Sequence, residues 1–427
     1  MSVKSESNAT PRVTIIGLGY VGLPLAKQFC KMGMTVVGFD TDSSKLEAVN
    51  NRKTEQLNVS EEDIGEMFAA GFSVTGDQSC LAVSDLIIVA VPTPVDENRA
   101  PNLAAVRGAA ESLATQVTNQ ALVVLESTVA PGTTENTFLK IIESKGKRHG
   151  RDFYLAFSPE RIDPGRENPQ LTEIPKVMAG LDSLALERAV ELYEKAGFSL
   201  IPTTRVRDAE ASKLIENTYR AMNIALVNEL APALSEISVD PHNAFSLAAT
   251  KPFGYHPFYP SAGAGGHCIA VDPFYLLSSF RDVGSSTPLL QTLESSSEVS
   301  RNALTARIIE AVAARPVEAT TELSVLLLGM TYKEDVGDFR HSPGLLLARS
   351  LIAKGLTVYY HDPFLTDPVP GLPAHHVRNL GQQTMNEFGA IVVVQMHEEY
   401  KALTAGSETT QLFSAAPTTG SIRGIWE

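Results

Sequence analysis

The chain has 427 residues, 44% hydrophobic and 20% charged, a composition typical of globular proteins with two or three domains. It carries 35 basic and 49 acidic residues, and the net charge of −14 argues against general binding to nucleic acid or to an anionic membrane. The apolar runs at 86–92, 323–330 and 390–394 are shorter than the roughly 18–20 residues of a membrane span. Three scattered cysteines predict neither a disulfide framework nor a metal site, and they fit a reducing cytoplasm.

In the first half of the chain, short apolar runs rich in β-branched residues alternate with helical stretches. The expected strands are Arg12–Ile16, Thr35–Phe39, Leu86–Val91, Ala121–Leu125, Tyr154–Phe157 and Lys176–Ala179. Strands that are apolar throughout are buried on both faces, as in a parallel sheet with helices on each side. We therefore predict a doubly wound α/β domain over residues 11–205.

A glycine fingerprint lies between the first expected strand and the helix after it, where VTIIGLGYVG contains Gly17, Gly19 and Gly22. In such a fingerprint the first glycine permits a tight turn and the second lets the backbone approach a pyrophosphate. The third lets the helix pack closely on the strand. Asp40 ends the next strand, where a carboxylate bonds ribose hydroxyls and repels a 2′-phosphate. The pattern predicts NAD rather than NADP as the cofactor.

Two later strand ends carry threonines, Thr93 in VPTP and Thr128 in ESTVAPGT. Because ligands bind at the carboxyl ends of strands in such sheets, both are candidates for the nicotinamide side of the cofactor. The alternative is that they cap the helices that follow. Lys45 is a candidate for the ribose, with a solvated surface lysine as the alternative, and Tyr20 and Val21 complete the expected cofactor contacts.

Apolar residues recur at helical spacing over about 207–238, which predicts one long helix, kinked or restarted at Pro232. Lys213, Asn217 and Arg220 are four and three residues apart, so they lie on one face of it. Lys213 and Asn217 suit the stabilisation of a developing oxyanion, and Arg220 suits an anionic or amide-bearing part of a substrate. The alternative is the solvated polar face of an amphipathic helix.

The run SAGAGGHCIAVDP at 261–273 places Cys268 behind three glycines and four residues before Asp272. Most cysteines are inert and buried, but here the glycines bring the backbone close to another group, and the carboxylate suits proton transfer. A thiolate adds to an aldehyde, the thiohemiacetal loses hydride to NAD, and the thioester is hydrolysed. The run therefore indicates aldehyde-level oxidation. His267 is a weaker candidate base, because neighbours in an extended loop point to opposite sides.

A third region begins at about Glu322, and its segment LARSLIAKGLTVYYHD at 347–362 matches LAKQFCKMGMTVVGFD at 25–40. Two α/β units built by the same rules would explain the match. We favour a duplicated domain whose second copy has a long charged loop in place of the phosphate loop. The expected architecture is thus two Rossmann-like domains, the second at 322–427, joined by a central all-helical domain at 206–315 that contains the long connecting helix.

These motifs resemble the UDP-glucose/GDP-mannose dehydrogenase family of nucleotide-sugar dehydrogenases. The resemblance runs nearly end to end, through GLGYVG, VPTP, ESTVAPGTT, FSPERIDPG, KLIENTYRAMNIALVNE, GGHCIAVDPFYL and GMTYKEDVGDFRHSP. It implies oxidation of the sugar C6 alcohol through an aldehyde to a carboxylate, with two NAD per turnover. It also implies a homodimer or larger homo-oligomer with the central helices at the interface.

The resemblance assigns catalytic roles to Cys268, Lys213, Asn217, Asp272, Glu160 and Thr128. In this set the cysteine is the nucleophile, the lysine and asparagine hold the oxyanion and position water, and the other three assist the attacking water and the proton relay. The implied substrate contacts are Glu160, Arg161, Ile162, Lys213, Asn217, Arg220, Tyr255, Tyr259, Gly265 and Lys333. Arg340, on the charged loop of the third region, corresponds to a contact with the cofactor pyrophosphate.

The segment LAATKPFGYHPFYP at 247–260 looks most like the UDP-N-acetylglucosamine 6-dehydrogenases that supply surface polysaccharides. UDP-N-acetylmannosamine and UDP-glucose are the alternative substrates. Two other classes of protein are alternatives: a single-step hydroxy-acid dehydrogenase of the two-domain kind, and a non-catalytic binding protein that kept the fold. Cys268 and the third region argue against the first, and the presence of Cys268, Lys213 and Asn217 argues against the second.

Overall fold

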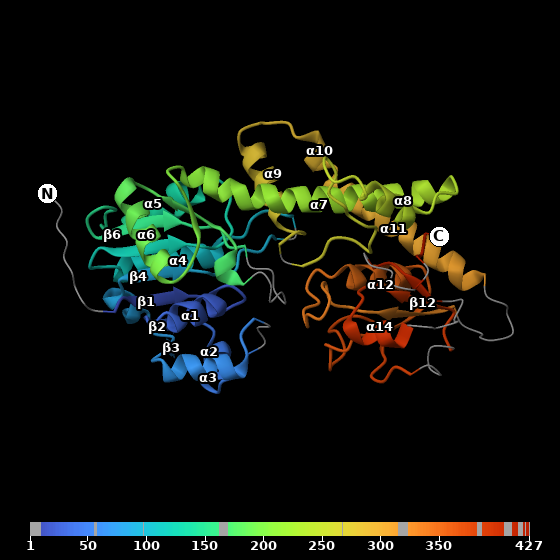
Figure 1. Ribbon diagram of the computed structural model, residues 1–427, viewed down its shortest axis with the longest axis horizontal. Helices are drawn as coiled ribbons and strands as arrows, with labels where there is room; N and C mark the ends of the chain where they lie inside the picture. The colour runs from blue at the N-terminus through green and yellow to red at the C-terminus, as the bar shows by residue number, and fades with distance from the viewer. Residues whose placement is uncertain are drawn as a thin grey trace. The chain divides into compact units, whose positions relative to one another are not determined.

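The computed structural model describes residues 10–54, 58–96, 98–161, 170–266, 268–314, 323–381, 387–404, 412–416, 422 and 424–426 (Figure 1). The chain divides into two compact units. The first is Met1–Glu216 with Phe274–Gly284, and the second is Asn217–Pro273 with Ser285–Glu427. Within the described ranges, no helix combines the length and the apolar character that crossing a membrane requires.

The first unit contains an eight-stranded sheet in the order β3-β2-β1-β4-β5-β6-β7-β8. Its strands are β1 Arg12–Ile16, β2 Thr35–Phe39, β3 Ser73–Thr75, β4 Leu86–Val89, β5 Ala121–Leu125, β6 Phe153–Phe157, β7 Lys176–Gly180 and β8 Leu200–Thr203. All six predicted strands form. The sequence did not indicate β3 and β8, because these short edge strands are partly exposed and lack a continuous apolar run.

One pair of strands corrects the expectation of a wholly parallel sheet. Strands β6 and β7 are antiparallel, whereas the other pairs in this sheet are parallel. A parallel pair needs a crossover connection, usually an α-helix. Among the described residues between β6 and β7, the one helical segment is the short turn η3 Leu171–Glu173, so the chain reverses direction there.

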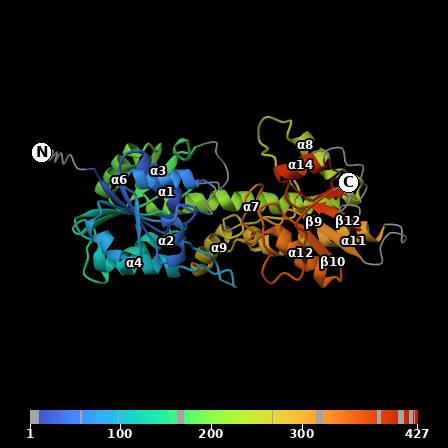
Figure 2. The same cartoon turned by 90° about the horizontal axis from the view of Figure 1, so that it is seen from below.

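Helices cover both faces of this sheet (Figure 2). On one face lie α1 Gly22–Lys31, α3 Glu61–Ala69 and α6 Ser183–Lys195, and on the other α4 Ala104–Gln116 and α5 Leu139–Glu143. Each of these helices buries an apolar stripe against strands that are themselves apolar on both sides. The remaining helical segments are α2 Ser43–Asn50, η1 Gln78–Val83 and η2 Thr134–Phe138.

Helix α7 is continuous from Val206 to Glu236 with Pro232 inside it, so the predicted long helix is confirmed. The helices α8 Pro241–Ala248, α9 Asp272–Asp282, α10 Pro288–Gln291 and α11 Leu293–Ala313 follow it. Asp240 caps α8 by accepting hydrogen bonds from two N–H groups of its first turn, which fixes the start of that helix.

The second unit contains a five-stranded sheet, wholly parallel, in the order β11-β10-β9-β12-β13. Its strands are β9 Ser324–Leu328, β10 Thr357–His361, β11 His375–His376, β12 Ala390–Val393 and β13 Leu412–Ser414. Helices α11 and α12 Pro343–Ala353 pack on one face, and α14 Glu398–Thr404 packs on the other (Figure 2). The predicted fold class, with two Rossmann-like sheets and a central helical region, is confirmed.

The two sheets repeat one plan, because β11-β10-β9-β12-β13 matches β3-β2-β1-β4-β5 in order. Gly17 and Gly329 follow the first strand of each sheet with positive φ values of 96° and 86°. A Cβ on Gly22 would collide with the carbonyl oxygen of Gly17, and a Cβ on Gly344 would lie 3.2 Å from that of Gly329. These observations support duplication, with a longer loop between the two glycines of the second copy.

Candidate active site

The glycine turn after β1 has the geometry that a dinucleotide pyrophosphate needs. A Cβ on Gly17 would lie 2.6 Å from the carbonyl oxygen of Ala90, so only glycine fits the turn. A Cβ on Gly19 would meet no protein atom within 4 Å, so this stretch of backbone faces open space. Helix α1 begins at Gly22 with no side-chain cap and no acidic residue in its first turn. Its N-terminus therefore suits an anionic phosphate, and the residues present fit NAD.

Asp40 is held in place at the end of β2, where it is 8% exposed. Its carboxylate accepts backbone N–H bonds from Leu18 at 2.9 Å and Asp42 at 3.0 Å, and the ammonium of Lys45 donates to it at 2.9 Å. Lys45 is therefore paired with Asp40 rather than merely solvated. A fixed negative charge beside the glycine turn favours ribose hydroxyls over a 2′-phosphate. Tyr20 and Val21 lie in the same turn, both partly buried.

The two candidate threonines do not cap the helices that follow them, because the N-cap residues of α4 and η2 are other residues. The carbonyl oxygen of Thr93 accepts a hydrogen bond from the Tyr275 hydroxyl at 2.9 Å. The Oγ1 of Thr128 accepts one from Nζ of Lys213 at 2.6 Å. Thr128 and Lys213, predicted as members of one catalytic set, thus lie in direct contact.

A buried carboxylate ties helix α7 to the loop after β5. Glu210, 1% exposed, accepts the N–H of Gly132 at 2.5 Å and both the N–H and the hydroxyl of Thr134, at 2.8 and 2.7 Å. Burial raises the pKa of Glu210, and the three hydrogen bonds oppose that rise. Lys213 lies one turn further along α7. Glu210 therefore holds in place the loop that carries Thr128, the hydrogen-bond partner of Lys213.

Glu160 lies in a buried network of four titratable side chains in the first unit, each no more than 4% exposed. The ammonium of Lys176 donates to Glu160 at 2.9 Å and to Glu126 at 2.7 Å. The hydroxyl of Tyr193 donates to the other oxygen of Glu126 at 2.5 Å. These groups come from the ends of β5 and β6, the start of β7 and helix α6.

The two carboxyl groups of this network have different protonation equilibria. Burial raises the pKa of Glu126 to about 7, even though Lys176 favours the ionised form. Burial also disfavours ionised Glu160, but Lys176 outweighs it and lowers the pKa of Glu160 below its ordinary value. At neutral pH Glu160 is therefore ionised, while Glu126 is close to half protonated.

Two predicted substrate contacts, Arg161 and Ile162, directly follow Glu160 in the chain. Arg161 forms an ion pair with Glu216, with 3.4 Å between Nε and Oε2. Its backbone N–H donates to the carboxylate of Glu160 at 2.6 Å. Ile162 lies outside the described residues. Arg220, three residues beyond Asn217 on α7, belongs to the second unit and is exposed.

In the second unit, Cys268 lies partly buried just ahead of α9 and forms no disulfide. The N–H of Asp272 donates to the carbonyl of Cys268 at 2.8 Å. Its carboxylate, 3% exposed, accepts a hydrogen bond from Nδ2 of Asn217 at 2.6 Å. Asn217 on α7 is thereby tied to the segment that carries the thiol. His267 lies outside the described residues, and burial raises the pKa of Cys30 to about 12, which keeps that thiol inert.

The glycines before Cys268 approach the charged loop between β9 and α12. A Cβ on Gly265 would lie 2.5 Å from Pro343 and 3.0 Å from Tyr332, and one on Gly266 would lie 2.7 Å from the Tyr332 ring. The segment that carries the thiol therefore packs on the loop that carries Lys333. A side chain at position 265 or 266 would clash with this loop, so packing within the protein explains why both residues are glycine.

The charged loop is anchored to its own sheet by His397, which is fully buried. The N–H of Asp335 donates to Nδ1 of His397 at 2.9 Å, and Nε2 of this ring lies 3.2 Å from the carboxylate of Asp362. Arg340, on the same loop, is exposed and bonds Asp338 at 2.6 Å. The loop is thus a fixed platform for its charged side chains.

The two predicted tyrosine contacts lie in the segment between α8 and Cys268. The ring of Tyr259 stacks on that of His242, with 4.9 Å between centroids. Tyr255 is 37% exposed. Both belong to the second unit, like Gly265 and Lys333.

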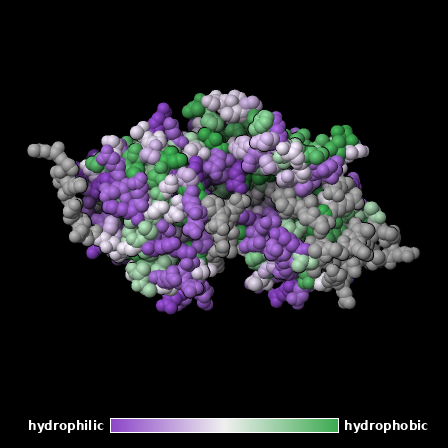
Figure 3. Space-filling model, in the orientation of Figure 1, coloured by the Kyte–Doolittle hydropathy of each residue, from purple (hydrophilic) through white to green (hydrophobic). Residues whose placement is uncertain are grey.

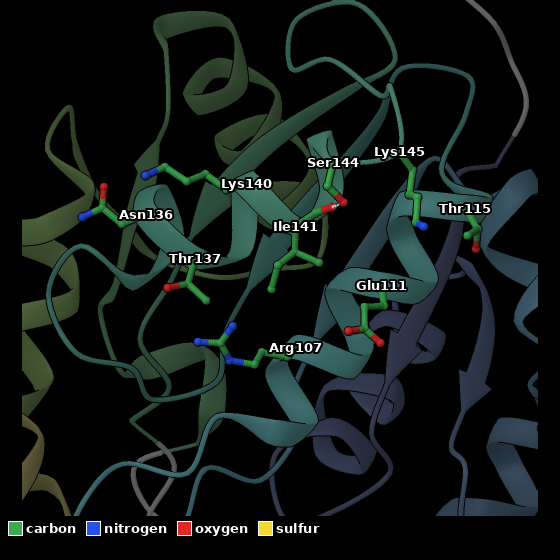
Figure 4. Close-up of a pocket in the computed structure, with 9 residues that line it drawn as sticks. All are labelled: Arg107, Glu111, Thr115, Asn136, Thr137, Lys140, Ile141, Ser144 and Lys145. Atoms are coloured by element: carbon green, nitrogen blue, oxygen red, sulfur yellow. Dashed lines mark hydrogen bonds between the residues drawn. The ribbon is translucent and has the colours of Figure 1, made fainter.

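A pocket of about 630 Å³ lies between α4 and α5 and contains none of the predicted site residues (Figure 4). Arg107 and Glu111 of α4 and Ile141 of α5 point toward its centre. Within the described ranges, no cluster of three or more His, Cys, Asp or Glu side chains has the arrangement of a metal site.

Sequence reasoning missed four residues that organise these groups: Glu126, Lys176, Tyr193 and Glu210. A signal existed for two of them, because Glu126 directly follows an apolar strand and Lys176 opens one. A charged residue in line with a buried strand needs a partner. No comparable signal marks Tyr193 or Glu210, since each looks like an ordinary member of a helix.

The fold and these groups define an NAD-dependent dehydrogenase with a second Rossmann-like sheet. Models of the UDP-glucose/GDP-mannose dehydrogenase family match the chain in three parts: the NAD binding domain at 11–197, the central domain at 207–298 and the UDP binding domain at 326–427. The chain belongs to this family.

Individual relatives of the chain are members of the same family. The UDP-N-acetyl-D-glucosamine 6-dehydrogenase of Pseudomonas aeruginosa is 32% identical over 398 residues, covering 92% of each chain. The UDP-N-acetyl-D-mannosamine dehydrogenase of Pyrococcus horikoshii is 30% identical, covering 92% of this chain and 91% of its own. A solved structure of the UDP-D-ManNAc dehydrogenase from Pyrococcus horikoshii superposes with a TM-score of 0.84 at 28% identity, covering 97% and 99%.

The protein is thus an NAD-dependent nucleotide-sugar dehydrogenase that oxidises C6 of a UDP-sugar. The match to all three family domains also separates it from the two-domain hydroxy-acid dehydrogenases.

Proposed function

We propose that the chain oxidises the C6 hydroxyl of a UDP-N-acetylhexosamine to the uronic acid, through a thiohemiacetal and a thioester on Cys268. The preferred substrate in this proposal is UDP-N-acetylglucosamine. The observation that carries the covalent chemistry is the placement of Cys268. Its carbonyl accepts the backbone N–H of Asp272, whose buried carboxylate accepts a 2.6 Å hydrogen bond from Asn217 on α7. Bound NAD supplies the hydride acceptor for each of the two oxidation steps, and water supplies the second carboxylate oxygen.

Helix α7 carries the residues that would hold the oxyanion. Lys213 and Asn217 lie one turn apart on it, and they offer an ammonium and an amide. An amide nitrogen has two hydrogens, so Asn217 bonds Asp272 with one and donates the other to the substrate. Thr128, whose oxygen already accepts a hydrogen bond from Lys213, would take the proton of the C6 hydroxyl and release its own hydroxyl proton to water.

The thioester is hydrolysed by water, and Asp272 and Glu160 are the proposed acceptors of its proton. Both are buried, at 3% and 4% exposure, and Lys176 keeps Glu160 ionised. A carboxylate that is ionised at neutral pH can orient a water molecule and take its proton.

Substitution of Cys268 by serine tests the covalent step. We expect Cys268→Ser to lose carboxylate formation by at least about a thousandfold, because a serine hydroxyl is a far weaker nucleophile than a thiolate. NAD binding, followed by calorimetry, is expected to be unchanged. The matched control is Cys80→Ser, which alters a cysteine outside the proposed machinery and should keep full activity. An unaffected carboxylate yield in Cys268→Ser would refute the mechanism.

The proposed acetamido substrate is supported by the relatives named for UDP-N-acetyl-D-glucosamine and UDP-N-acetyl-D-mannosamine. Arg161, Arg220, Tyr255 and Tyr259 are the proposed contacts for the sugar and uracil, and Lys333, Gly265 and Ile162 complete the set. The test is NADH formation with UDP-N-acetylglucosamine, UDP-N-acetylmannosamine, UDP-N-acetylgalactosamine and UDP-glucose. A preference for UDP-glucose or for UDP-N-acetylmannosamine would contradict the interpretation of residues 247–264 as the signal for UDP-N-acetylglucosamine.

We also propose a homodimer that packs along α7. Tyr219, Leu226 and Leu230 leave an exposed apolar stripe on this helix. Apolar side chains also gather on the surface over α8 and the α9–α10 segment, including Leu247 and Leu289 (Figure 3). Light scattering of Leu226→Asp against the wild-type protein tests the dimer, and an unchanged mass would contradict it.

The domain limits 11–205, 206–315 and 322–427, the cytoplasmic location and the pyrophosphate contact of Arg340 stay predictions.

A further inference from the structure

The buried network behind Glu160 has no part in the chemistry proposed so far beyond holding Glu160. It contains two carboxyl groups, Glu126 and Glu160, and one ammonium, Lys176. Were both carboxyl groups ionised, the cluster would carry a net negative charge with almost no exposure to water. Such a charge is costly to bury, so the cluster favours retention of one proton.

We propose that Glu126 is a buried proton acceptor for Glu160, and that Lys176 and Tyr193 hold the two carboxyl groups in position for the transfer. This inference rests on the proposed action of Glu160 on water. In the proposed step the O–H bond on Glu160 breaks, an O–H bond forms on Glu126, and Glu160 returns to its ionised state. Glu126 then acts through Glu160 and does not touch the substrate.

The geometry provides the path. Lys176 binds both carboxylates, at 2.7 and 2.9 Å, so a single ammonium group bridges the two carboxyl groups. Tyr193 donates to the oxygen of Glu126 that Lys176 does not bind, which fixes the rotation of that group. A proton received by Glu160 therefore has a second carboxyl group, held on the same ammonium, as its acceptor.

The direction of transfer follows from the charges around each carboxyl group. Glu126 faces Lys176 of β7, Tyr193 of α6 and Glu160, while Glu160 also feels Lys213 of α7. Burial raises the pKa of Glu126 to about 7, and the neighbouring charge of Glu160 adds to that rise. For Glu160, Lys176 outweighs burial and lowers the pKa, and Lys213 makes a smaller contribution, so Glu160 is the stronger acid. A proton on Glu160 thus moves downhill to Glu126 whenever Glu126 is ionised.

The test is the pH dependence of kcat, measured from pH 5.5 to 9 with saturating NAD and the panel substrate that the enzyme turns over. The wild-type enzyme is expected to lose activity below about pH 7, where Glu126 is already protonated. In Glu126→Gln the amide cannot accept a proton, so kcat should fall about tenfold or more near pH 8 and no longer vary around pH 7. KM should stay the same.

Tyr193→Phe provides a second variant that keeps the carboxyl group. It removes a hydrogen bond that favours ionised Glu126, so the fall in kcat should move up by about one pH unit. Thr14→Val is the matched control, because Thr14 is equally buried in the same unit and makes one 2.7 Å hydrogen bond to Ser84. It should lower stability and leave the pH profile in place.

A fall in kcat that keeps its wild-type position in both Glu126→Gln and Tyr193→Phe overturns the relay. Glu160→Gln separates this outcome from failure of the underlying function. If Glu160→Gln retains wild-type kcat at every pH, the proposed action of Glu160 on water is wrong. If Glu160→Gln is inactive while the Glu126 and Tyr193 variants keep the wild-type profile, only the relay is wrong.

Discussion

Replacement of Gly19 by alanine separates cofactor binding from folding more sharply than any other single change. An added Cβ at this position meets no protein atom within 4 Å, and Gly19 is not among the residues with positive φ. The free energy of unfolding should therefore stay the same or rise by up to about 1 kcal/mol, because alanine restricts the unfolded chain. The new methyl group would nevertheless occupy the space through which the backbone approaches the pyrophosphate.

The expected loss of NAD affinity follows from the steric cost of an extra methyl group in a close contact, about 1–3 kcal/mol. This corresponds to roughly a tenfold to hundredfold higher Kd, measured by calorimetry. Gly22→Ala is the contrasting variant, because its Cβ would collide with the carbonyl of Gly17 and should destabilise the fold itself. Gly108→Ala on α4, where a Cβ also has open space, is the control. An NAD Kd within twofold of wild type in Gly19→Ala would refute the assignment of this turn.

Three further predictions concern buried carboxyl groups. Asp40→Asn removes the charge that repels a 2′-phosphate. The ratio of kcat/KM for NAD to kcat/KM for NADP should therefore fall by about tenfold. An unchanged ratio would contradict the role of Asp40. Glu210→Ala leaves three buried donors without their acceptor, at a cost of about 1 kcal/mol each. The free energy of unfolding, measured in urea, should therefore fall by about 3 kcal/mol. A fall of less than about 1 kcal/mol would contradict these hydrogen bonds. Because the pKa of Glu126 is raised from 4.5 to about 7, its contribution to stability is present below pH 4.5 and lost as pH rises through 7. Glu126→Gln should remove this loss of about 3 kcal/mol, and urea midpoints from pH 5 to 8 that fall equally in both proteins would disprove it.

The sequence predicted most of the strands of the first sheet, because strands that are buried on both faces must be apolar throughout. That pattern located β1, β2, β4, β5, β6 and β7. It failed at β3 and β8, which lie at sheet edges and are only partly covered. It could not indicate that β6 and β7 are antiparallel, because strand direction depends on the connection rather than on the apolar run itself.

The candidate site was predicted unevenly for a related reason. Motifs such as the glycine turn are local, so spacing along the chain reveals them. Partnerships such as Asn217 with Asp272, or Glu126 with Lys176, join residues about fifty positions apart, and their distances depend on the packed fold. The residue types could be proposed as a set, but which of them touch required the structure.

The most direct test of the proposed function is the stoichiometry of NADH formed per UDP-sugar consumed, with the product identified by mass spectrometry. We expect two NADH and one uronic acid for each UDP-N-acetylglucosamine, and at least about a thousandfold slower formation of uronic acid by Cys268→Ser. One NADH per sugar with release of the aldehyde, or two NADH from a Cys268→Ser enzyme of undiminished rate, would contradict it.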